Sequence, residues 1–448
     1  MRGISVLVAG AGLAGLTAAR ELAKKGAAVT VIDARGRAGG RVLTVREPFL
    51  YGGHAEAGAD LIDESQTEIC KLIAAVGLRT ARIIAGGFTS VRDAGGRKRI
   101  GGKRAWKDLS SRLQREVRAF CLSEQRWDSG VAESLARQSV AEWLERSRAP
   151  KPIKEAAVGL RGFFLADPAE LSLLALVDQF AEDGAPGREK MFRIVGGNDR
   201  LPAALAKALG PRLRLHTVLR RITQKRDAVT VALDSNGRVE EARFDHVVCA
   251  MPATTMRDVV IEPALPDLQR EALSSLKYGA STKTALQFDR APWRTRGQPR
   301  AFGTALPIGA VWDGNEEQIR ARRGSAIRQP GILTLLAGGS ASAATQDILA
   351  TEGPARIVHE MSWLPLRNTE LIAWASVSWE RERWSRGGYA FFDPQFAPAL
   401  RYWLARPFDR IFFAGEHTSL RWQGYMNGAV ESGLRAAEEV SYASTQKR

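Results

Sequence analysis

The sequence predicts an α/β protein with two domains, and three observations lead to that expectation. Near the N-terminus, the apolar segments 4–9 and 29–33 enclose a helical segment, as in parallel strands joined by a helix. After residue 77 this alternation gives way to a helical, charged stretch, and it resumes near residue 191. The 448 residues also exceed what one compact core usually holds. We therefore expect one α/β domain that is interrupted by a second domain.

The loop between the first two expected strands carries three glycines at the spacing GxGxxG. Gly10, Gly12 and Gly15 follow the strand ISVLVA and open a helix. Gly10 permits a tight turn, Gly12 lets the backbone approach a pyrophosphate, and Gly15 lets helix and strand pack closely. The helix N-terminus supplies positive potential to phosphates. Asp33 ends the next strand, where a carboxylate can bind ribose hydroxyls, so these features together predict dinucleotide binding.

Composition excludes several other classes of protein. The three cysteines, Cys70, Cys121 and Cys249, form no CxxC pair, and the five histidines are scattered. We therefore expect no disulfide framework, no metal site and a reducing, cytoplasmic environment. No run of about 18 apolar residues is present, so no membrane anchor is expected. The first residues resemble a signal peptide, but the pattern continues into a second strand, which favours folded structure.

The chain is basic, with a formal net charge of +16. Residues 92–126 contain 11 basic and 4 acidic residues, including GRKRIGGKRAWK. A solvated basic surface is the simplest interpretation of this segment, although positive charge can also attract an acidic partner. No nucleic-acid-binding motif accompanies the charge, so we expect no nucleic-acid partner. A homodimer is compatible with the sequence.

A more specific resemblance begins at Asp33. The segment 33–41, DARGRAGGR, resembles the loop that follows the second strand in the flavin-containing amine oxidase family. In that family the glycines let the chain pass the FAD diphosphate, and the arginines help to bind it. The segment 58–63, GADLID, resembles the next family segment. The resemblance implies that Gly58 and Ala59 lie close to the flavin ring or its ribityl chain.

The resemblance continues through the middle of the chain. Val218 matches a family valine whose backbone contacts adenine. In the strand expected at 278–293, Lys283 matches the family lysine that hydrogen-bonds a water beside flavin N5. A lysine ammonium is a compact donor whose pKa shifts on burial. It is suited to positioning water and to assisting reoxidation of the flavin by oxygen.

The C-terminal tracts extend the resemblance. The segment 373–400 is similar to a family tract in which an aromatic-rich strand leads to two glycines and an aromatic residue, here Tyr389. In mammalian monoamine oxidases a cysteine before that tyrosine is attached to the flavin, whereas this chain has Gly388, which implies non-covalent FAD. Glu416 matches an acid that accepts a hydrogen bond from a ribityl hydroxyl. The opening of the last helix near Gly424 would direct amides at the flavin edge that becomes anionic.

The resemblance implies a set of site residues. The resemblance assigns catalytic roles to Lys283, Tyr389 and Tyr425. The two tyrosines match a pair of aromatic residues that, in monoamine oxidases, flank the amine and exclude water. FAD contacts fall to Gly10, Gly12, Ala14, Gly15, Asp33, Ala34, Arg35, Gly40, Arg41, Gly58, Ala59, Asp60, Val218, Trp384, Gly388, Gly415, Glu416, Gly424, Tyr425 and Met426.

The implied fold is the two-domain flavin amine oxidase fold, with a Rossmann-like FAD-binding domain and a mixed-sheet and helical substrate domain. Residues 1–77, 191–268 and 383–448 are assigned to the FAD-binding domain, and residues 78–190 and 269–382 to the substrate domain. The implied reaction transfers a hydride from the carbon beside an amine nitrogen to flavin N5. The imine is then hydrolysed to an aldehyde or ketone, and O2 is the expected electron acceptor and yields H2O2.

Other interpretations stay open. An L-amino-acid oxidase of the same fold needs an arginine to hold the substrate carboxylate, and Arg161 in GLRGFFLADP is available for that role. A flavin desaturase acting on carbon–carbon bonds fits the two tyrosines less well. A non-catalytic flavoprotein, or a nucleic-acid-associated factor that acts through residues 92–126, has no need of Lys283 and both tyrosines.

Overall fold

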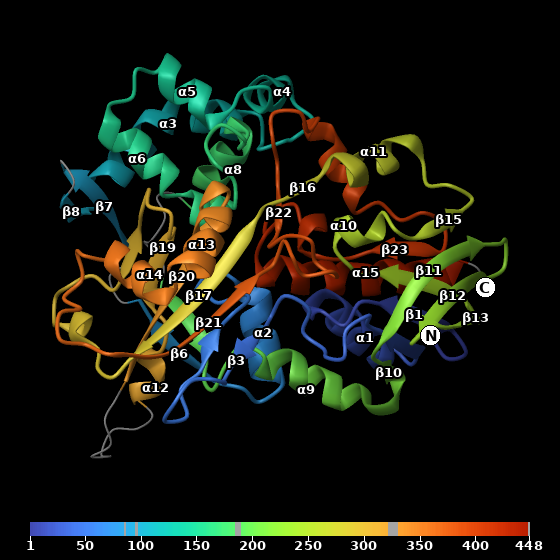
Figure 1. Ribbon diagram of the computed structural model, residues 1–448. Helices are drawn as coiled ribbons and strands as arrows, with labels where there is room; N and C mark the ends of the chain where they lie inside the picture. Colours follow the sequence, from blue (N-terminus) through green and yellow to red (C-terminus); the bar gives the residue numbers. More distant parts are fainter. Residues whose placement is uncertain (85–86, 95–96, 184–189, 321–329, 447–448) are drawn as a thin grey trace.

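The computed structural model describes residues 1–84, 87–94, 97–183, 190–320 and 330–446. Two lobes lie side by side, and both chain termini belong to the same lobe (Figure 1). The other lobe holds the largest sheet, with a group of helices above it in that view (Figure 1). Residues that are far apart in the sequence therefore meet where the two lobes join.

A five-stranded parallel sheet forms the centre of the first lobe. Its order is β10 (Leu213–Arg214), β2 (Ala28–Ile32), β1 (Ser5–Ala9), β14 (His246–Cys249) and β23 (Ile411–Phe413). The two strands expected at 4–9 and 29–33 are thus confirmed as β1 and β2. They lie next to each other, as parallel strands joined by one helix should.

The two faces of this sheet pack against different layers. Val6 and Val8 of β1 share a hydrophobic core with α1 (Leu13–Lys24) and α15 (Met426–Gln446). Leu7 and Ala9, which point the other way, pack toward a second sheet. Its order is β13 (Arg238–Phe244), β12 (Val229–Ser235), β11 (Thr217–Gln224) and β15 (Val260–Glu262).

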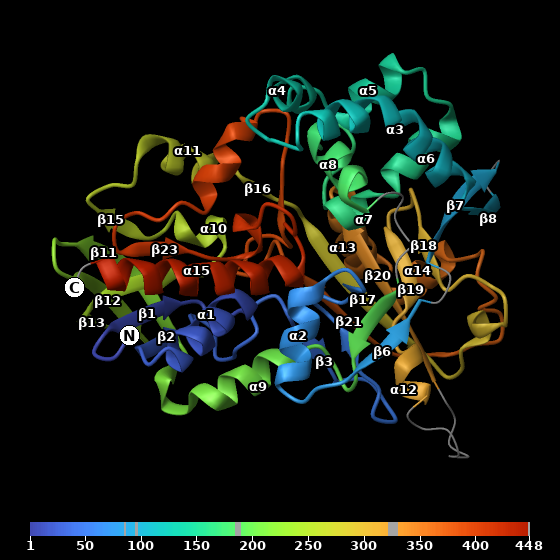
Figure 2. The same cartoon turned by 180° about the vertical axis from the view of Figure 1, so that it is seen from behind.

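The first and last helices of the chain lie together on one face of the parallel sheet, in front of it in the reverse view (Figure 2). Their close approach depends on Gly433, because a Cβ there would lie 2.4 Å from the carbonyl oxygen of Ala14. This contact fixes the start of α15 relative to the start of α1.

The second lobe is built on a seven-stranded sheet. Its order is β21 (Leu371–Ser378), β17 (Ser281–Phe288), β20 (Gly331–Gly338), β19 (Ala310–Asp313), β18 (Ala301–Gly303), β7 (Phe88–Ala94) and β8 (Arg97–Gly102). All eight residues of β17 are buried. Lys283 pairs with Leu336 on one side and Val377 on the other. The strand expected at 278–293 is thus confirmed as β17, which lies inside the sheet with both faces buried.

Residues 78–190 were expected to be helical throughout, and this is wrong for the first part of the segment. Residues 80–102 form β6 (Thr80–Ile83), β7 and β8, and helices begin only with α3 (Arg104–Leu122). The basic side chains of Arg97 and Arg99 in β8 are exposed, so no apolar alternation marks that strand. The amphipathic stretch SVAEWLERS is confirmed as α5 (Val140–Arg146). There Ser139 and Glu142 cap the helix reciprocally at 3.1 Å and 2.8 Å.

The remaining elements connect and cover these sheets. The small strands are β3 (Thr44–Val45), β4 (Ala55–Glu56), β5 (Ile62–Asp63), β9 (Met191–Ile194), β16 (Lys277–Tyr278) and β22 (Ala390–Phe391). The α-helices are α2 (Thr67–Ala75), α4 (Gly130–Ala136), α6 (Lys151–Val158), α7 (Arg161–Phe164), α8 (Leu173–Asp183), α9 (Arg200–Leu209), α10 (Ala253–Met256), α11 (Asp267–Ser275), α12 (Glu316–Arg320), α13 (Ser340–Thr351) and α14 (Pro354–Glu360). The 3-10 helices are η1 (Gly210–Arg212), η2 (Pro292–Arg294), η3 (Pro398–Leu404) and η4 (Glu416–Thr418).

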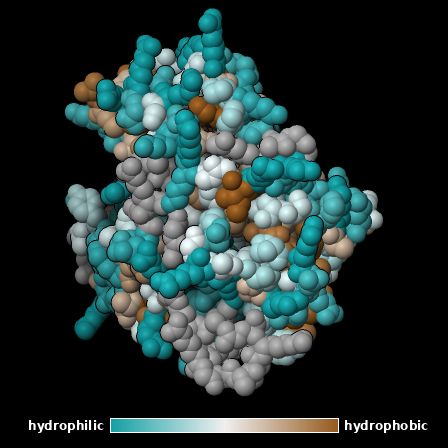
Figure 3. All heavy atoms as spheres, turned by 90° about the vertical axis from the view of Figure 1, so that its left-hand side faces the viewer, coloured by the Kyte–Doolittle hydropathy of each residue, from teal (hydrophilic) through white to brown (hydrophobic). Residues whose placement is uncertain are grey.

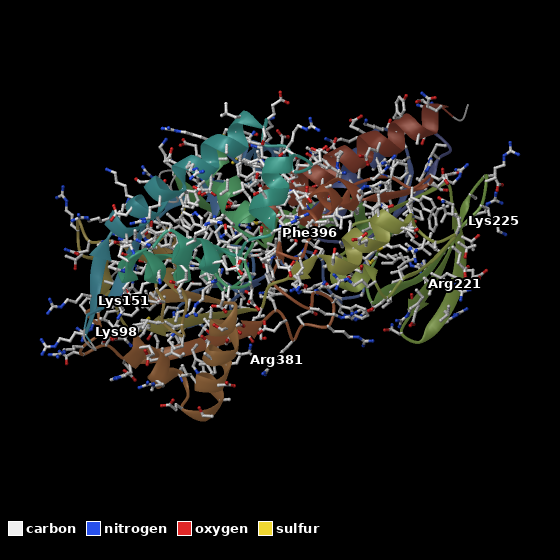
Figure 4. The ribbon with its side chains drawn as sticks, turned by 90° about the horizontal axis from the view of Figure 1, so that it is seen from above. Lys98, Lys151, Arg221, Lys225, Arg381 and Phe396 are labelled. Carbon is white, nitrogen blue, oxygen red and sulfur yellow. The ribbon has the colours of Figure 1, made fainter. Side chains whose placement is uncertain are left out.

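Polar residues dominate one face of the molecule (Figure 3), and basic residues occur at both of its ends (Figure 4). The face shown in Figure 3 is mostly hydrophilic, with scattered hydrophobic residues. Lys98 and Lys151 lie at one end of the molecule, whereas Arg221 and Lys225 lie at the other (Figure 4). In the described part of the chain, no helix combines the length and apolar character needed to cross a membrane.

Candidate active site

A cavity of about 670 Å³ brings together segments from both lobes. Lys283, Tyr389 and Tyr425 line it. So does every residue to which the resemblance assigned an FAD contact, with the exception of Gly15. Gly15 lies at the contact between α1 and β1, where a Cβ would sit 1.9 Å from the carbonyl oxygen of Gly10. We call the part around Gly10, Gly12, Asp33 and Val218 the glycine-loop end, and the part around Lys283, Tyr389 and Tyr425 the tyrosine end.

Backbone groups dominate the glycine-loop end. Gly10 has a φ of +111°, and a Cβ there would meet the carbonyl oxygen of Ala250 at 2.8 Å. A Cβ on Gly12 would meet nothing within 4 Å, so this residue borders open space. Gly12 is also the N-cap of α1, and no side chain caps that helix. The free amides at the helix start form a site suited to phosphate.

Asp33 is held rigidly beside these amides. Its carboxylate accepts hydrogen bonds from the backbone N–H groups of Ala11 and Arg35, each at 2.8 Å. Burial raises its pKa, and these hydrogen bonds oppose the shift. The carbonyl oxygen of Asp33 accepts a hydrogen bond from the N–H of Thr217, which places Val218 beside it. A carboxylate has about four acceptor sites, so Asp33 can still bind hydroxyl groups.

The arginines of the segment 33–41 make bonds within the protein. Arg35 donates to Glu382 and, at 2.8 Å, to the hydroxyl of Ser385, and so ties this loop to the segment that carries Trp384. Arg41 donates to the carbonyl oxygen of Gly388 at 2.8 Å and to Glu416 at 3.0 Å. These arginines position the cavity walls whether or not they also contact a ligand.

Glu416 connects this network to the start of the last helix. Its second oxygen accepts the N–H of Gly424 at 2.9 Å. Gly424 has a φ of +82°, and a Cβ there would meet the ring of Tyr389 at 3.2 Å. Helix α15 begins two residues later, at Met426, which also lines the cavity. A glycine is required at position 424 both for its backbone conformation and for its closeness to Tyr389.

Lys283 belongs to a buried ionic cluster. Its ammonium donates to Asp60 at 2.9 Å and to the carbonyl oxygen of Gly58 at 2.8 Å. Asp60 also binds Arg193 at 2.6 Å, and Arg193 binds Glu317 at 2.8 Å. Burial lowers the pKa of Lys283, and the Asp60 carboxylate opposes that shift. Burial by itself would raise the pKa of Asp60, but Arg193 and Lys283 outweigh it and lower that pKa.

Glu56 lies next to this cluster and differs from the other acids in it. Its carboxyl group accepts hydrogen bonds from the N–H of Asn198 at 2.9 Å and from the hydroxyl of Thr44 at 2.8 Å. Burial, together with the negative charge of Asp60, raises its pKa to about 8. At neutral pH Glu56 is therefore mainly protonated. The two cations Lys283 and Arg193 are then balanced by Asp60 and Glu317.

The two tyrosines are anchored through their hydroxyl groups. Tyr389 donates to the carbonyl oxygen of Phe163 at 2.5 Å, and burial raises its pKa. Tyr425 donates to the side chain of Gln179 at 3.3 Å. The ring of Trp422 meets that of Tyr425 edge-on, with centroids 5.7 Å apart and an interplanar angle of 85°. Trp422 therefore packs behind Tyr425.

Several cavity residues escaped the sequence interpretation. Phe163, Gln179, Asp178, Trp312 and Trp379 line the cavity and come from separate segments of both halves of the chain. Trp312 donates to Asp60 at 3.1 Å, and Trp379 donates to the carbonyl oxygen of Ala57 at 2.8 Å. The paired phenylalanines of the sequence GFF are the one local feature that could have indicated an apolar cavity wall.

Arg161 does not reach the cavity, and its proposed role as a carboxylate ligand is wrong. Its guanidinium donates to the carbonyl oxygens of Ala305 at 3.0 Å and Leu306 at 2.6 Å. It also lies 3.4 Å from Asp167. Because α7 lies against the large sheet, this side chain is directed toward the loop after β18 and away from the tyrosine end.

Comparison with known proteins agrees with this geometry. The sequence model of the family "Flavin containing amine oxidoreductase" matches residues 13–441. This chain belongs to that family. It is accordingly an FAD-dependent oxidoreductase, and oxidation of an amine is the class of reaction that the family supports.

Individual relatives of this amine oxidoreductase span nearly its whole length. AofH of Mycobacterium tuberculosis, named as a flavin-containing monoamine oxidase, is 27% identical over 98% of this chain and 96% of its own. The L-amino acid oxidase Bs29 of Bothriechis schlegelii is 28% identical over 98% of this chain and 90% of its own. The structure of cyclohexylamine oxidase from Brevibacterium oxydans has a TM-score of 0.84 at 23% identity, over 99% of this chain and 100% of that one. This last likeness confirms the two-lobed fold.

The cavity of this family member fits FAD. The uncapped amides of α1 and the open space at Gly12 suit a diphosphate, and Asp33 suits a ribose. At the other end Glu416 accepts the amide of Gly424, and the amides of the first turn of α15 suit a ring system that gains negative charge.

Proposed function

We propose that this enzyme oxidises a small amine at the carbon beside its nitrogen, with the amine held between Tyr389 and Tyr425. FAD, when bound, accepts the hydride that leaves that carbon. The observation that carries the proposal is the meeting of Tyr389, Tyr425 and Lys283, from three separate segments, on one cavity. A plain nucleotide-binding protein has no need of that arrangement.

The tyrosines would hold the amine and keep water away from it. Aromatic rings present electron-rich faces to a nitrogen, and their burial excludes water. The raised pKa of Tyr389 keeps its phenol neutral, and its hydroxyl is already bound to Phe163. Tyr389 is therefore a wall of the site, and the amine must enter in its neutral form to react.

Lys283 would position water, or O2 during reoxidation, at the tyrosine end. An ammonium has three N–H donors, and two of them bind Asp60 and Gly58. The third remains available to the cavity. Asp60 holds the lysine in place and is therefore a positioning residue. This role replaces the direct FAD contact that the resemblance implied for Asp60.

Four of the five arginines that line the cavity are held in ion pairs. Arg41 is bound to Glu416, and Arg401 is bound to Asp178 at 3.0 Å. Arg161 is directed elsewhere, but Arg421 lines the cavity with its guanidinium over the ring of Trp422 and makes no ion pair among the described residues. The paired tyrosines, rather than the arginines, support an amine over an α-amino acid, and both classes of enzyme occur among the relatives.

FAD is proposed to bind without a covalent bond. Position 388 is a glycine, so it offers no side chain that could attach to the flavin. Acid denaturation should therefore release FAD into solution, and flavin that stays with the precipitate would contradict this.

The five-segment domain division, O2 as the physiological acceptor, a homodimer and a cytoplasmic location stay predictions.

The reaction is tested by its products. In air, a primary amine should yield one aldehyde and one H2O2 per amine consumed, together with ammonia. The Tyr389→Leu and Tyr425→Leu variants should retain FAD but turn over slowly. If neither amine consumption nor H2O2 is detected with any amine while FAD is present, the proposed function is wrong.

A further inference from the structure

Arg193 is a buried cation that lies outside the cavity but is bonded to one of the residues that line it. It belongs to β9, the middle strand of a three-stranded sheet, and is only 1% exposed. Met191 of the same strand lines the cavity, whereas Arg193 does not. A buried guanidinium needs anionic partners to offset its loss of water, and Arg193 has two of them, Asp60 and Glu317.

The guanidinium of Arg193 joins these two acids. Its Nε donates to Oδ1 of Asp60 at 2.7 Å, and its Nη2 lies 2.6 Å from the same oxygen. On the other side, Nη1 donates to Glu317 of α12 at 2.8 Å and to the carbonyl oxygen of Gly314 at 2.8 Å. Because the donors of a guanidinium are fixed in one plane, these contacts on both sides hold Arg193 in one position.

The two oxygens of Asp60 have different partners. Oδ1 faces Arg193, whereas Oδ2 accepts hydrogen bonds from the ammonium of Lys283 at 2.9 Å and from the indole N–H of Trp312 at 3.1 Å. Arg193 thus sets the orientation of the carboxylate from outside the cavity, and this orientation directs Oδ2 at Lys283. Asp60 therefore transmits the position of Arg193 to Lys283.

The charge of Arg193 acts in the same direction as its geometry. Burial by itself would raise the pKa of Asp60, and the charge of Arg193 is the largest effect that lowers it. Lys283 depends on the Asp60 carboxylate, because burial lowers the pKa of its ammonium. The cations Arg193 and Lys283 balance the anions Asp60 and Glu317. A variant that tests Arg193 should therefore lose one anion as well, so that the cluster stays neutral.

We propose that Arg193 is a positioning residue for reoxidation of the flavin: it orients the Asp60 carboxylate, which in turn holds the ammonium of Lys283 at the tyrosine end. In that step O2 accepts two electrons and one proton from the reduced flavin, takes a second proton from solvent, and leaves as H2O2. The inference rests on the role of Lys283 in the proposed function and extends it to a residue that does not line the cavity.

The test measures reoxidation by O2 after the FAD-loaded protein has been reduced with stoichiometric dithionite, so that no substrate is needed. Arg193→Met/Glu317→Gln removes one cation and one anion. It should slow reoxidation about tenfold, because Lys283 is no longer held in one place. Arg193→Lys keeps the charge but not the contacts on both sides, and should slow reoxidation about threefold.

An exposed ion pair in the other lobe provides the matched control. Arg243→Met/Asp227→Asn also removes one cation and one anion, and it should leave the reoxidation rate unchanged.

Two further readouts distinguish positioning from a general loss of structure. In the Lys283→Met background, Arg193→Met/Glu317→Gln should slow reoxidation no further, because the residue that Arg193 positions is gone. A crystal structure of the FAD-loaded Arg193→Met/Glu317→Gln variant should show that the ammonium of Lys283 has left Asp60. If that double variant does not fold, Arg193→Lys decides by the same measurements.

The outcomes separate this inference from the proposed function. If Lys283→Met slows reoxidation but the substitutions of Arg193 do not, the inference is wrong and the proposed role of Lys283 stands. It is equally wrong if they slow reoxidation as much in the Lys283→Met background as in the natural chain. If Lys283→Met leaves the rate unchanged, the role of Lys283 and the inference fail together. Failure of every amine to reduce the flavin refutes the proposed function whatever these rates are.

Discussion

At the glycine-loop end of the cavity, the groups that face a ligand are backbone amides and one fixed carboxylate, whereas at the tyrosine end they are side chains. Gly10, Gly12 and the start of α1 lie within a few residues of one another in the sequence. Lys283, Tyr389 and Tyr425 come from distant segments, and each is held by a further residue. Substitutions at the glycine-loop end should therefore affect the binding of FAD, and substitutions at the tyrosine end should affect the oxidation of the substrate.

The largest effect is expected from Gly12→Val. A side chain at position 12 would enter open space in the cavity, so the protein should fold but lose its FAD almost completely. The FAD-to-protein ratio, together with circular dichroism, checks this. Gly130→Val is the control, because Gly130 also borders open space but lies outside the cavity. A yellow Gly12→Val protein would overturn the assignment of the glycine-loop end.

At the tyrosine end, Asp60→Asn should lower the free energy of unfolding by about 3–5 kcal/mol, because Lys283 is left as a buried charge without its partner. Urea unfolding of the FAD-loaded protein measures it. Asp128→Asn removes an exposed carboxylate and should change little. Equal destabilisation by the two variants would show that the buried cluster has no special role.

Lys283→Met should slow reoxidation of the reduced flavin by O2 roughly a hundredfold, since it removes a positioned donor from the cavity. Stopped-flow mixing of the anaerobically reduced protein with oxygenated buffer measures the rate. The anaerobic reduction step should change less. Lys151→Met, on the exposed surface of α6, is the control. An unchanged reoxidation rate would remove Lys283 from the proposed scheme.

The smallest effect concerns pH. Because the pKa of Glu56 in the folded protein, about 8, lies above its ordinary value of 4.5, the folded state binds the extra proton between these values. The contribution of this group to stability is therefore full below about pH 4.5 and falls as the pH rises toward 8. Glu56→Gln should flatten this decline in thermal unfolding measurements. A variant with the same pH dependence as the natural chain would contradict the buried, protonated state.

The difference between the glycine-loop end and the tyrosine end also explains which parts of the site the sequence could predict. The glycine spacing, the two strands and Asp33 act through local backbone geometry, so their places in the fold followed from the pattern. The three strands at 80–102 were missed because exposed basic residues such as Arg82, Arg97 and Arg99 interrupt any apolar alternation. The partners of Lys283 could not be predicted either, because Asp60 and Gly58 lie far away in the sequence. The resemblance to a family supplied Tyr389 and Tyr425, whereas Phe163 and Gln179 required the three-dimensional packing.

The central claim is that the cavity oxidises amines that lack an α-carboxylate. Anaerobic mixing of the FAD-loaded protein with pairs of compounds, each an amine and the α-amino acid with the same side chain, tests it most directly. The account predicts that the amines bleach the flavin absorbance and that the α-amino acids leave it unchanged. Bleaching by the α-amino acids alone would contradict it.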